Sequence, residues 1–289
     1  MFVKFPLMQY SSIEWTDFTS NPLKYRTPDG SIVWACVHKS AGCEHCYAEQ
    51  LAKRYGRGRP FKAENINTLM PFMDQKELRH MLTYKPAGGH RCFVGDMTDL
   101  FGEWVSFELL DQLFAVFALR SNVTWQLLTK RPDRMLEYLQ NGPRAAWHVA
   151  GENFPLKNVW LGVSAEDQKN ADLRIPMLLK TPAAIRFVSY EPALGPIRFF
   201  TAPLAGKSVN LDWIIIGGES GPGSRPSDRR WFYDVIGDCK AAGVAAFIKQ
   251  LGTKSQFDSG PLLRLKDRKG GSPEEWPEDL RVRQFPQIR

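Results

Sequence analysis

The segment Val159-Trp-Leu-Gly-Val163 is a short apolar run, and a helix-like segment, residues 168–179, follows it closely. A second apolar run, Ile185-Arg-Phe-Val-Ser189, comes soon after that segment. Short apolar runs that alternate with amphipathic stretches are typical of β/α units, whose strands pair in parallel. This part of the sequence therefore predicts one β/α/β unit of a parallel sheet.

The same alternation continues along most of the chain. Further strands are predicted over residues 92–95, 125–129, 213–217 and 245–249, and further helices over residues 107–120, 133–140 and 230–242. A chain of 289 residues with 43% hydrophobic content can bury one large core, and α/β barrels of this size commonly form one domain. We therefore expect an α/β fold, a partial or closed (β/α) barrel formed by residues 36–252.

The two ends of the chain have a different character. Residues 1–35 are aromatic-rich and carry turn signals such as Asn21-Pro22, so we expect an irregular N-terminal lead-in that packs on the core. Residues 253–289 are rich in Lys, Arg, Pro and Gly, which predicts an exposed C-terminal tail, an extension or flap.

The charge balance and the hydropathy indicate which partners and which location to expect. Lysine and arginine exceed aspartate and glutamate to a formal net charge of +7, and the pI is about 9.1. Such a balance is expected when a partner carries phosphates, as DNA or a nucleotide does. No stretch approaches the roughly 20 apolar residues of a membrane-spanning helix, and the start of the chain lacks the apolar run of a signal peptide. We expect a soluble, cytoplasmic protein without a membrane partner.

Three of the five cysteines lie in one loop, Cys36-Val-His-Lys-Ser-Ala-Gly-Cys43-Glu-His-Cys46, with the spacing C-x6-C-x2-C. An odd number of cysteines is unsuited to a framework of paired disulfides, and the crowding favours a metal site. Thiolates in one loop can hold an iron–sulfur cluster, and Gly42 lets the backbone approach it closely. Three ligands leave one iron of a [4Fe–4S] cluster open to bind a small molecule, here S-adenosylmethionine (SAM). We therefore predict Cys36, Cys43 and Cys46 as cluster ligands.

A zinc site is the main alternative for this loop. Its fourth ligand would come from His38, His45, Cys92 or a distant residue, and the protein would then be a zinc-stabilised nucleic-acid-binding module. The second C-x2-C or H-x3-H pair expected of such modules is missing downstream.

A helix predicted over residues 47–55 begins directly after the last cysteine, and its dipole favours an anionic centre there.

Several short motifs follow one another in order along residues 11–252. They are Ile13-Glu-Trp-Thr-Asp17, Asn21-Pro22, the cysteine loop ending Cys46-Tyr-Ala-Glu49, Phe93-Val-Gly-Asp-Met-Thr-Asp-Leu100, Leu128-Thr-Lys-Arg-Pro132, Trp160-Leu-Gly-Val-Ser164, Ser189-Tyr-Glu-Pro192, Ile216-Gly-Gly-Glu-Ser-Gly221 and Phe247-Ile-Lys-Gln250. With them the chain resembles the phage-associated three-cysteine-motif branch of the radical SAM family, which is distantly similar to spore photoproduct lyase. Two features depart from the pattern: the usual spacing is C-x3-C-x2-C, and the segment between Asn21-Pro22 and Cys36 is longer.

The resemblance implies a barrel of the radical SAM type and its chemistry. A [4Fe–4S] cluster, fed by an external one-electron reductant, would cleave SAM to a 5′-deoxyadenosyl radical in the cytoplasm of the infected or host bacterial cell. The implied substrate is a modified pyrimidine in phage DNA or its nucleotide, and the reaction a hypermodification, for example isomerising an amino-acid adduct of thymidine. Repair of DNA photoproducts by a lyase reaction is the alternative with the same chemistry. The sequence does not indicate an oligomeric state.

Polar residues follow the predicted strands, at the end where the active site of a barrel lies. The resemblance implies a hydrogen-bond partner for the SAM amino group directly after the strand predicted over residues 92–95. Asp96 and Thr98 lie at that place. It also implies a cation or a hydroxyl for the SAM carboxylate, which Lys130 and Ser164 would supply.

Other strand-end residues are candidates for catalysis and for binding phosphates. A polar ring that could relay a proton or a hydrogen atom is predicted from Tyr190, Glu191, Glu219 and Lys249. Basic side chains close to Trp231 are expected to contact the phosphates of a nucleic acid, and these are Arg225, Arg229 and Arg230.

Overall fold

The computed structural model of the chain describes residues 7–55, 59–85, 90–141, 154–199 and 211–287. Residues 1–6 of the predicted lead-in and residues 288–289 of the predicted tail lie outside these ranges. The chain divides into two compact units. Unit 1 is Met1–Leu161 with Lys180–Ala184, and unit 2 is Gly162–Leu179 with Ile185–Arg289.

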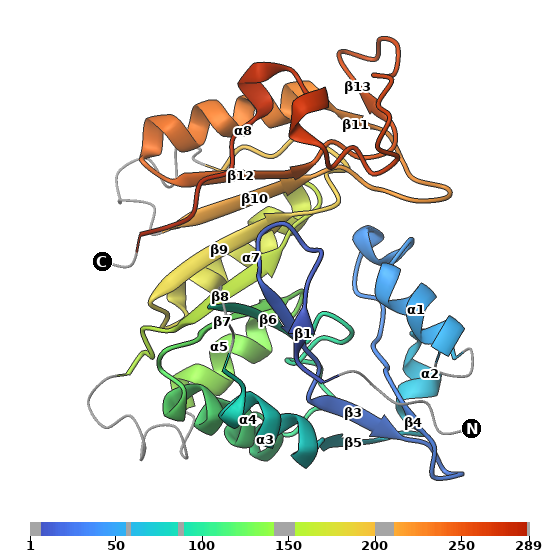
Figure 1. Cartoon of the computed structure of the whole chain (residues 1–289), viewed down its shortest axis with the longest axis vertical. Coiled ribbons are helices and arrows are strands. Elements are labelled where there is room, and N and C mark those ends of the chain that lie inside the picture. The colour runs from blue at the N-terminus through green and yellow to red at the C-terminus, as the bar shows by residue number, and fades with distance from the viewer. Residues whose placement is uncertain (1–6, 56–58, 86–89, 142–153, 200–210, 288–289) are drawn as a thin grey trace. The chain divides into compact units, whose positions relative to one another are not determined.

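The main sheet has eight strands in the order β1-β2-β6-β7-β8-β9-β10-β12 (Figure 1). Their bounds are β1 Gln9–Tyr10, β2 Phe18–Ser20, β6 Arg91–Val94, β7 Thr124–Thr129, β8 Val159–Ser164, β9 Ile185–Tyr190, β10 Trp213–Gly217 and β12 Ala245–Gln250. The pairs β2–β6, β6–β7, β9–β10 and β10–β12 are parallel, whereas β1–β2 is antiparallel. The predicted α/β class is therefore confirmed. Among the described residues the strand order has two ends and does not close into a ring, as in the partial form of the predicted barrel.

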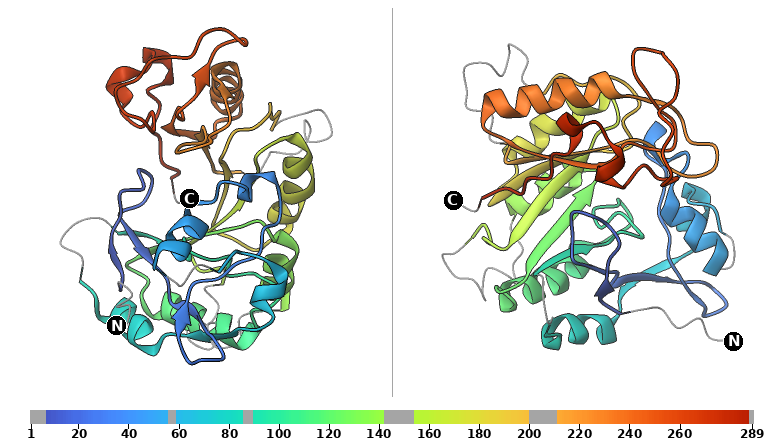
Figure 2. Two further views of the ribbon diagram at one scale, coloured as in Figure 1. Left: turned by 90° about the vertical axis from the view of Figure 1, so that its right-hand side faces the viewer. Right: turned by 45° about the horizontal axis from the view of Figure 1, so that its top comes forward.

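Unit 1 also contains a three-stranded antiparallel sheet in the order β4-β3-β5 (Figure 2). Its strands are β3 Leu23–Arg26, β4 Ile32–Val33 and β5 Met70–Met73, and the helices of the unit are α1 Tyr47–Tyr55, α2 Ala63–Ile66, α3 Gln75–Thr83, α4 Phe107–Leu119 and α5 Pro132–Asn141. In α4, Leu110, Leu113, Phe114 and Phe117 are buried at helical spacing, so one apolar face attaches the helix to the core.

The N-terminal segment differs from the sequence prediction. Instead of an irregular lead-in, it contributes β2 to the main sheet, where Phe18 pairs with Cys92 of β6. The Phe18 side chain is fully buried. A strand of three residues is too short to show the alternation that identifies longer strands, so it escaped the pattern.

Unit 2 contains two helices, α7 Gln168–Lys180 and α8 Arg229–Ala242. The last residue of α7, Lys180, is counted with unit 1. The Asp228 carboxylate caps the start of α8 by accepting from the Arg230 backbone N–H, and Gly243 ends the helix with φ 67°. Phe232, Val235 and Cys239 form its buried face, so Cys239 is the core residue that its helical spacing indicates. α8 packs against β12 (Figure 2).

The C-terminal segment, predicted as an exposed extension or flap, packs at a few positions, while most of its described residues are half-buried or exposed. It contains the short strand β13 Ser255–Gln256, paired with β11 Ser227–Asp228, and the single turns η2 Pro273–Glu275 and η3 Glu278–Leu280. Trp276 and Leu280 are buried, and the Trp276 indole donates to the Gly270 carbonyl at 3.0 Å. None of the helices described in either unit has the length and apolar character needed to span a bilayer.

Candidate cofactor site and strand-end residues

The cysteine loop of unit 1 lies between β4 and α1, with the turn η1 Ala41–Cys43 inside it. The thiols of Cys36, Cys43 and Cys46 are free and half-buried. Burial raises the pKa of Cys36 to about 12, and the nearby Cys46 thiol adds to that rise. Burial also raises the pKa of Cys46, and the nearby Cys43 thiol adds to that rise. The Cys46 thiol thus lies near each of the other two predicted ligands.

The thiols do not converge on one point. Among the described residues, no three Cys, His, Asp or Glu side chains are gathered as the ligands of a single metal ion would be. Cys36 and Cys46 instead pack against an apolar wall that includes Trp34, Phe61 and Met97. The loop therefore presents its thiols from a water-poor surface.

The backbone is fixed on both sides of Cys36. The Thr98 hydroxyl donates to the Ala35 carbonyl at 2.7 Å, and the Arg131 guanidinium donates to the Val37 carbonyl at 3.0 Å. Each donor follows a different strand of the main sheet, β6 or β7. The position of the first cysteine is therefore set by two contacts that are far apart in sequence.

Thr98 is buried, and its hydroxyl already has protein partners. Besides the Ala35 carbonyl, it is hydrogen-bonded to the Tyr25 hydroxyl at 3.0 Å, which in turn accepts from the Trp104 indole at 2.7 Å. Burial raises the pKa of Tyr25, so this hydroxyl stays protonated. These contacts make Thr98 a positioning residue for the loop.

Arg131 lies at the centre of a buried ionic network. Its side chain is only 3% exposed, and it pairs with Asp99 at 3.1 Å and with Glu103 at 2.7 Å. The guanidinium also lies 4.7 Å from the centre of the Trp104 ring, within the range of a cation–π contact. Asp99 accepts from the Thr129 hydroxyl at 2.6 Å, which attaches the network to β7.

Asp96 is held beside the end of the cysteine loop. The Asn21 side-chain amide donates to its carboxylate at 2.5 Å and accepts from the Met97 backbone N–H at 3.0 Å. The Tyr47 hydroxyl donates to the Asp96 backbone carbonyl at 2.9 Å and lies 3.4 Å from its carboxylate. Asp96 is thus connected to Tyr47, the residue that directly follows Cys46. Burial raises the pKa of Asp96.

Lys130 also lies near the last cysteine. Its positive charge lowers the pKa of Cys46, against the larger effect of burial. The Lys130 backbone N–H donates to Asp99 at 3.1 Å, which fixes the main chain, and within the described ranges no acidic side chain forms an ion pair with its amine. The structure therefore brings two predicted SAM-binding residues, Asp96 and Lys130, to the cysteine loop.

On unit 2, Glu191 connects several of the predicted strand-end residues. Its carboxylate pairs with the Lys249 amine at 3.2 Å and accepts from the Ser189 hydroxyl at 3.2 Å. The Ser164 hydroxyl donates to the Glu191 backbone carbonyl, also at 3.2 Å. Gly217 leaves room for this carboxylate, because a Cβ there would stand 2.3 Å from the Glu191 Oε1. Ser164, which was predicted to bind SAM, thus lies together with Glu191 and Lys249.

The other two predicted members of the polar ring have separate partners. Tyr190 is buried, and its hydroxyl donates to the Gly195 carbonyl. Burial raises the pKa of Tyr190, and strand alternation points its ring away from the face that Ser189 occupies. Glu219 forms an ion pair with Arg225 at 2.5 Å. The structure therefore supports a Glu191–Lys249 pair more than a continuous ring.

The comparisons with known proteins give one family. Residues 10–275 match DUF5131, which is described as a protein of unknown function. The chain belongs to the DUF5131 family. Neither the curated proteins nor the solved structures contain a match. Since the family description names no activity, the function of this DUF5131 protein has to be argued from its side chains.

The three arginines predicted to contact phosphates differ in their surroundings. Arg225 is held by Glu219, and Arg230 pairs with Asp228 at 2.9 Å and with Asp258 at 2.7 Å. Among the described residues, no acidic side chain forms an ion pair with Arg229; its Nε is buried without a hydrogen-bond partner, and its guanidinium lies 5.8 Å from the Phe257 ring centre. Of the three, Arg229 has the guanidinium least committed to other protein groups.

Three residues that shape this DUF5131 site belong to the ordered motifs, but the sequence assigns them no role in it. Asn21 orients Asp96. Tyr47 donates to the Asp96 carbonyl, and Arg131, which follows the third predicted strand, donates to the Val37 carbonyl. One feature of the sequence could have indicated the contact between Asn21 and Asp96. Asn21-Pro22 and the motif of residues 93–100 both belong to the ordered set of motifs that carries the family resemblance.

Proposed function

We propose that this protein is a radical SAM enzyme that acts on a pyrimidine of DNA or of a nucleotide. The observation that carries the proposal is the cysteine loop, in which three free thiols follow one another while the backbone on both sides of Cys36 is fixed. Cys36, Cys43 and Cys46 would hold a [4Fe–4S] cluster. When bound, such a cluster supplies an electron, taken from an external reductant, for the cleavage of SAM.

The donor set suits a cluster better than the zinc alternative. Each thiolate of a cubane cluster ligates a different iron, so the thiols stand farther apart than the ligands of one ion. A tetrahedral zinc site needs four ligands around one point, and the sequence lacks the second C-x2-C or H-x3-H pair that would supply them. Burial and the Asp99 carboxylate raise the pKa of Cys36, and the positive charge of buried Arg131 partly opposes that rise.

Two side chains next to the loop have the chemistry to bind SAM. The Asp96 carboxylate, oriented by Asn21 and Tyr47, can accept hydrogen bonds from the amino group. The Lys130 amine can pair with the carboxylate of the same methionine portion. On unit 2, we assign proton transfer with the substrate to the Lys249 amine, which lies 3.2 Å from Glu191 Oε1.

Anaerobic reconstitution tests the proposal directly. The purified protein, supplied with iron and sulfide, should turn brown and bind about four irons per chain. After reduction by dithionite it should convert SAM to 5′-deoxyadenosine, which chromatography measures. A protein that takes up one zinc per chain and no iron under these conditions would establish the zinc module instead.

Asp96→Asn and Lys130→Met are expected to weaken SAM binding while leaving the iron content unchanged. A hydrogen bond to a charged group contributes about 1.5–3 kcal/mol, which corresponds to roughly a 10- to 150-fold loss of affinity. Equilibrium binding of SAM to the reconstituted variants measures the loss. Lys53→Met, on the exposed side of α1, is the matched control and should bind SAM as the wild type does.

The nucleosides of cells with and without the gene would separate the two reactions that the resemblance implies. A hypermodifying isomerase should change the mass spectrum or the retention time of one modified pyrimidine. A repair lyase should instead break the bond between two cross-linked thymines of an irradiated oligonucleotide and restore both within the strand, in the presence of SAM and reductant. A chain that cleaves SAM but does neither would place the substrate outside DNA pyrimidines.

A further inference from the structure

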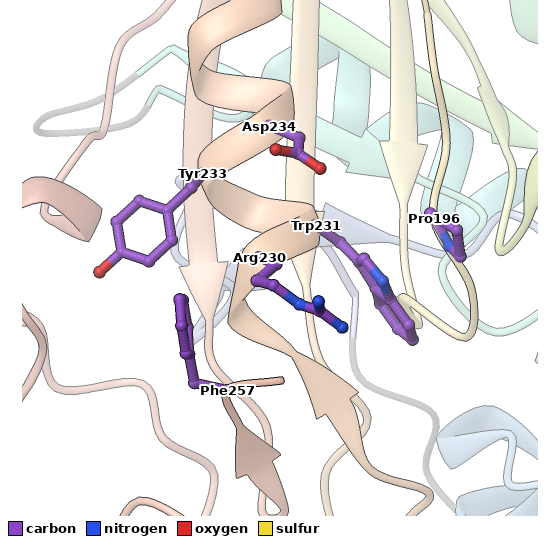
Figure 3. A pocket seen from close by; sticks show the side chains of 6 residues that line it. All are labelled: Pro196, Arg230, Trp231, Tyr233, Asp234 and Phe257. Carbon is purple, nitrogen blue, oxygen red and sulfur yellow. The ribbon is translucent and has the colours of Figure 1, made fainter. Parts of the chain in front are cut away.

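A pocket of about 540 Å³ lies beside the first turns of α8 in unit 2 (Figure 3). Its volume falls in the range of about 300–1,000 Å³ that is usual for small-molecule sites. The lining side chains come from the start of α8, from the loop after β9 and from the residue after β13; they are Pro196, Arg230, Trp231, Tyr233, Asp234 and Phe257.

Aromatic rings form much of this pocket. Trp231 is half-buried and Phe257 is 46% exposed, so their ring faces are accessible to a ligand. Tyr233 meets Phe257 edge to face, with ring centres 6.2 Å apart at 77°. Figure 3 shows Arg230 with Tyr233 and Phe257 to one side of it and Trp231 and Pro196 to the other. Half-exposed rings around a cavity suit a flat, unsaturated ligand that stacks.

The turn that carries Phe257 is held in a strained conformation. Asp258 and Ser259, directly after it, have φ values of 52° and 58°. Residues other than glycine seldom adopt this left-handed region of backbone conformation. The turn is attached to the start of α8, because the Asp258 carboxylate pairs with Arg230 at 2.7 Å and its backbone N–H donates to Asp228 at 3.3 Å. Strain of this kind persists where surrounding contacts enforce it, and it is frequent at binding sites.

The charges around the pocket are mixed. Arg230 is matched by Asp228 and Asp258, and Asp234 adds a further carboxylate to the lining. A free phosphate would be repelled by these acids, whereas the edge of a nucleobase offers both N–H donors and carbonyl acceptors. Asp234 can accept from such donors and Arg230 can donate to such acceptors. Arg229, whose guanidinium lies 5.8 Å from the Phe257 ring centre, remains for the attached phosphate.

We infer that this pocket binds an unstacked pyrimidine base of a DNA strand, with the base stacked on Trp231 and Phe257. The inference rests on the proposed function for the choice of DNA, and it adds a base-binding site outside the cysteine loop. Aromatic platforms interleaved with arginine are the means by which proteins hold single strands. A base inside a duplex cannot enter such a pocket without leaving its stack.

The test measures the binding of a fluorescent oligodeoxythymidylate of about twelve nucleotides to the reconstituted protein. Trp231→Ala and Phe257→Ala should each weaken binding by about 5- to 150-fold, the effect of losing one stacked base. Trp231→Phe keeps a stacking face and should retain most of the affinity. The exposed aromatic residue Tyr10 of unit 1 supplies the matched control, and Tyr10→Ala should bind normally. Circular dichroism verifies that each variant is folded.

Two competitors identify the source of the base. If thymidine 5′-monophosphate displaces the oligonucleotide from the wild type and not from Trp231→Ala, the pocket takes a free nucleotide as well as a strand. A duplex of equal length should compete poorly. Equal affinity of both alanine variants and the wild type for the oligonucleotide, or duplex binding as tight as single-strand binding, would overturn the inference.

Failure of this inference can be told apart from failure of the proposed function. Trp231→Ala should still cleave SAM at the wild-type rate in the absence of DNA, because the pocket contains none of the proposed cluster or SAM ligands. Cys46→Ala should lose SAM cleavage while it binds the oligonucleotide with wild-type affinity. If the wild type binds no iron but its binding of the oligonucleotide still depends on Trp231, the proposed radical chemistry is refuted and the base-binding pocket is retained.

Discussion

Replacing any one of Cys36, Cys43 and Cys46 by alanine is expected to remove the bound iron and to abolish SAM cleavage. Two thiolates leave two irons of a four-iron cluster without a protein ligand, and such a cluster does not persist in water. Iron analysis after anaerobic desalting, together with 5′-deoxyadenosine formation, measures both effects. We expect the activity of each variant to fall below detection.

The two remaining cysteines supply the controls for this experiment. Cys92 and Cys239 are buried in β6 and α8, where they act as small apolar side chains. Cys92→Ala and Cys239→Ala should therefore keep about four irons per chain. A loop variant that retains as much iron as these two variants would refute the assignment of that cysteine.

Arg131→Leu is expected to lower the free energy of unfolding by about 3–5 kcal/mol, the usual effect of breaking a buried ion pair. The substitution leaves Asp99 buried without its partner and frees the Val37 carbonyl beside Cys36. It also removes the contact with the Trp104 ring. Urea titration followed by tryptophan fluorescence measures the change, and the midpoint should shift clearly to lower urea.

An exposed ion pair provides the comparison for Arg131. Lys62 and Glu64 are 3.8 Å apart, with side chains that are 60% and 74% exposed. Lys62→Met should change the unfolding free energy by no more than about 1 kcal/mol, as is typical of surface pairs. If Arg131→Leu is as mild as Lys62→Met, the network around Arg131 does not hold the loop.

Much of the fold could be predicted because six strands of the main sheet are longer apolar runs. The runs that begin near Cys92, Trp125, Val159, Ile185, Trp213 and Ala245 all proved to be strands. The short strand β2 could not be found this way, since it gains its place from pairing with β6 and not from its own pattern. Likewise, the charged composition of residues 253–289 hides Trp276 and Leu280, two apolar side chains that are buried.

The candidate site could be predicted only in part. Parallel strands bring their carboxyl ends to one edge of a sheet, which is why Glu191 and Lys249 meet although they are far apart in sequence. Sequence position does not tell where a hydroxyl points. Thr98 is turned to the Ala35 carbonyl and Tyr190 to the Gly195 carbonyl, choices that depend on burial and on partners from distant segments.

The last strand of the main sheet is protected by the chain itself. The Ile248 N–H donates to the Val282 carbonyl at 2.8 Å, the Gln284 N–H donates to the Ala246 carbonyl at 2.9 Å, and Phe247 and Arg283 form a β-bridge between these bonds. An uncovered edge strand is a template for pairing with other chains. Residues 282–284 occupy those backbone groups of β12, and they lie beyond residue 275, where the family match ends. A chain cut at that boundary would therefore keep its cysteine loop and acquire a surface prone to self-association.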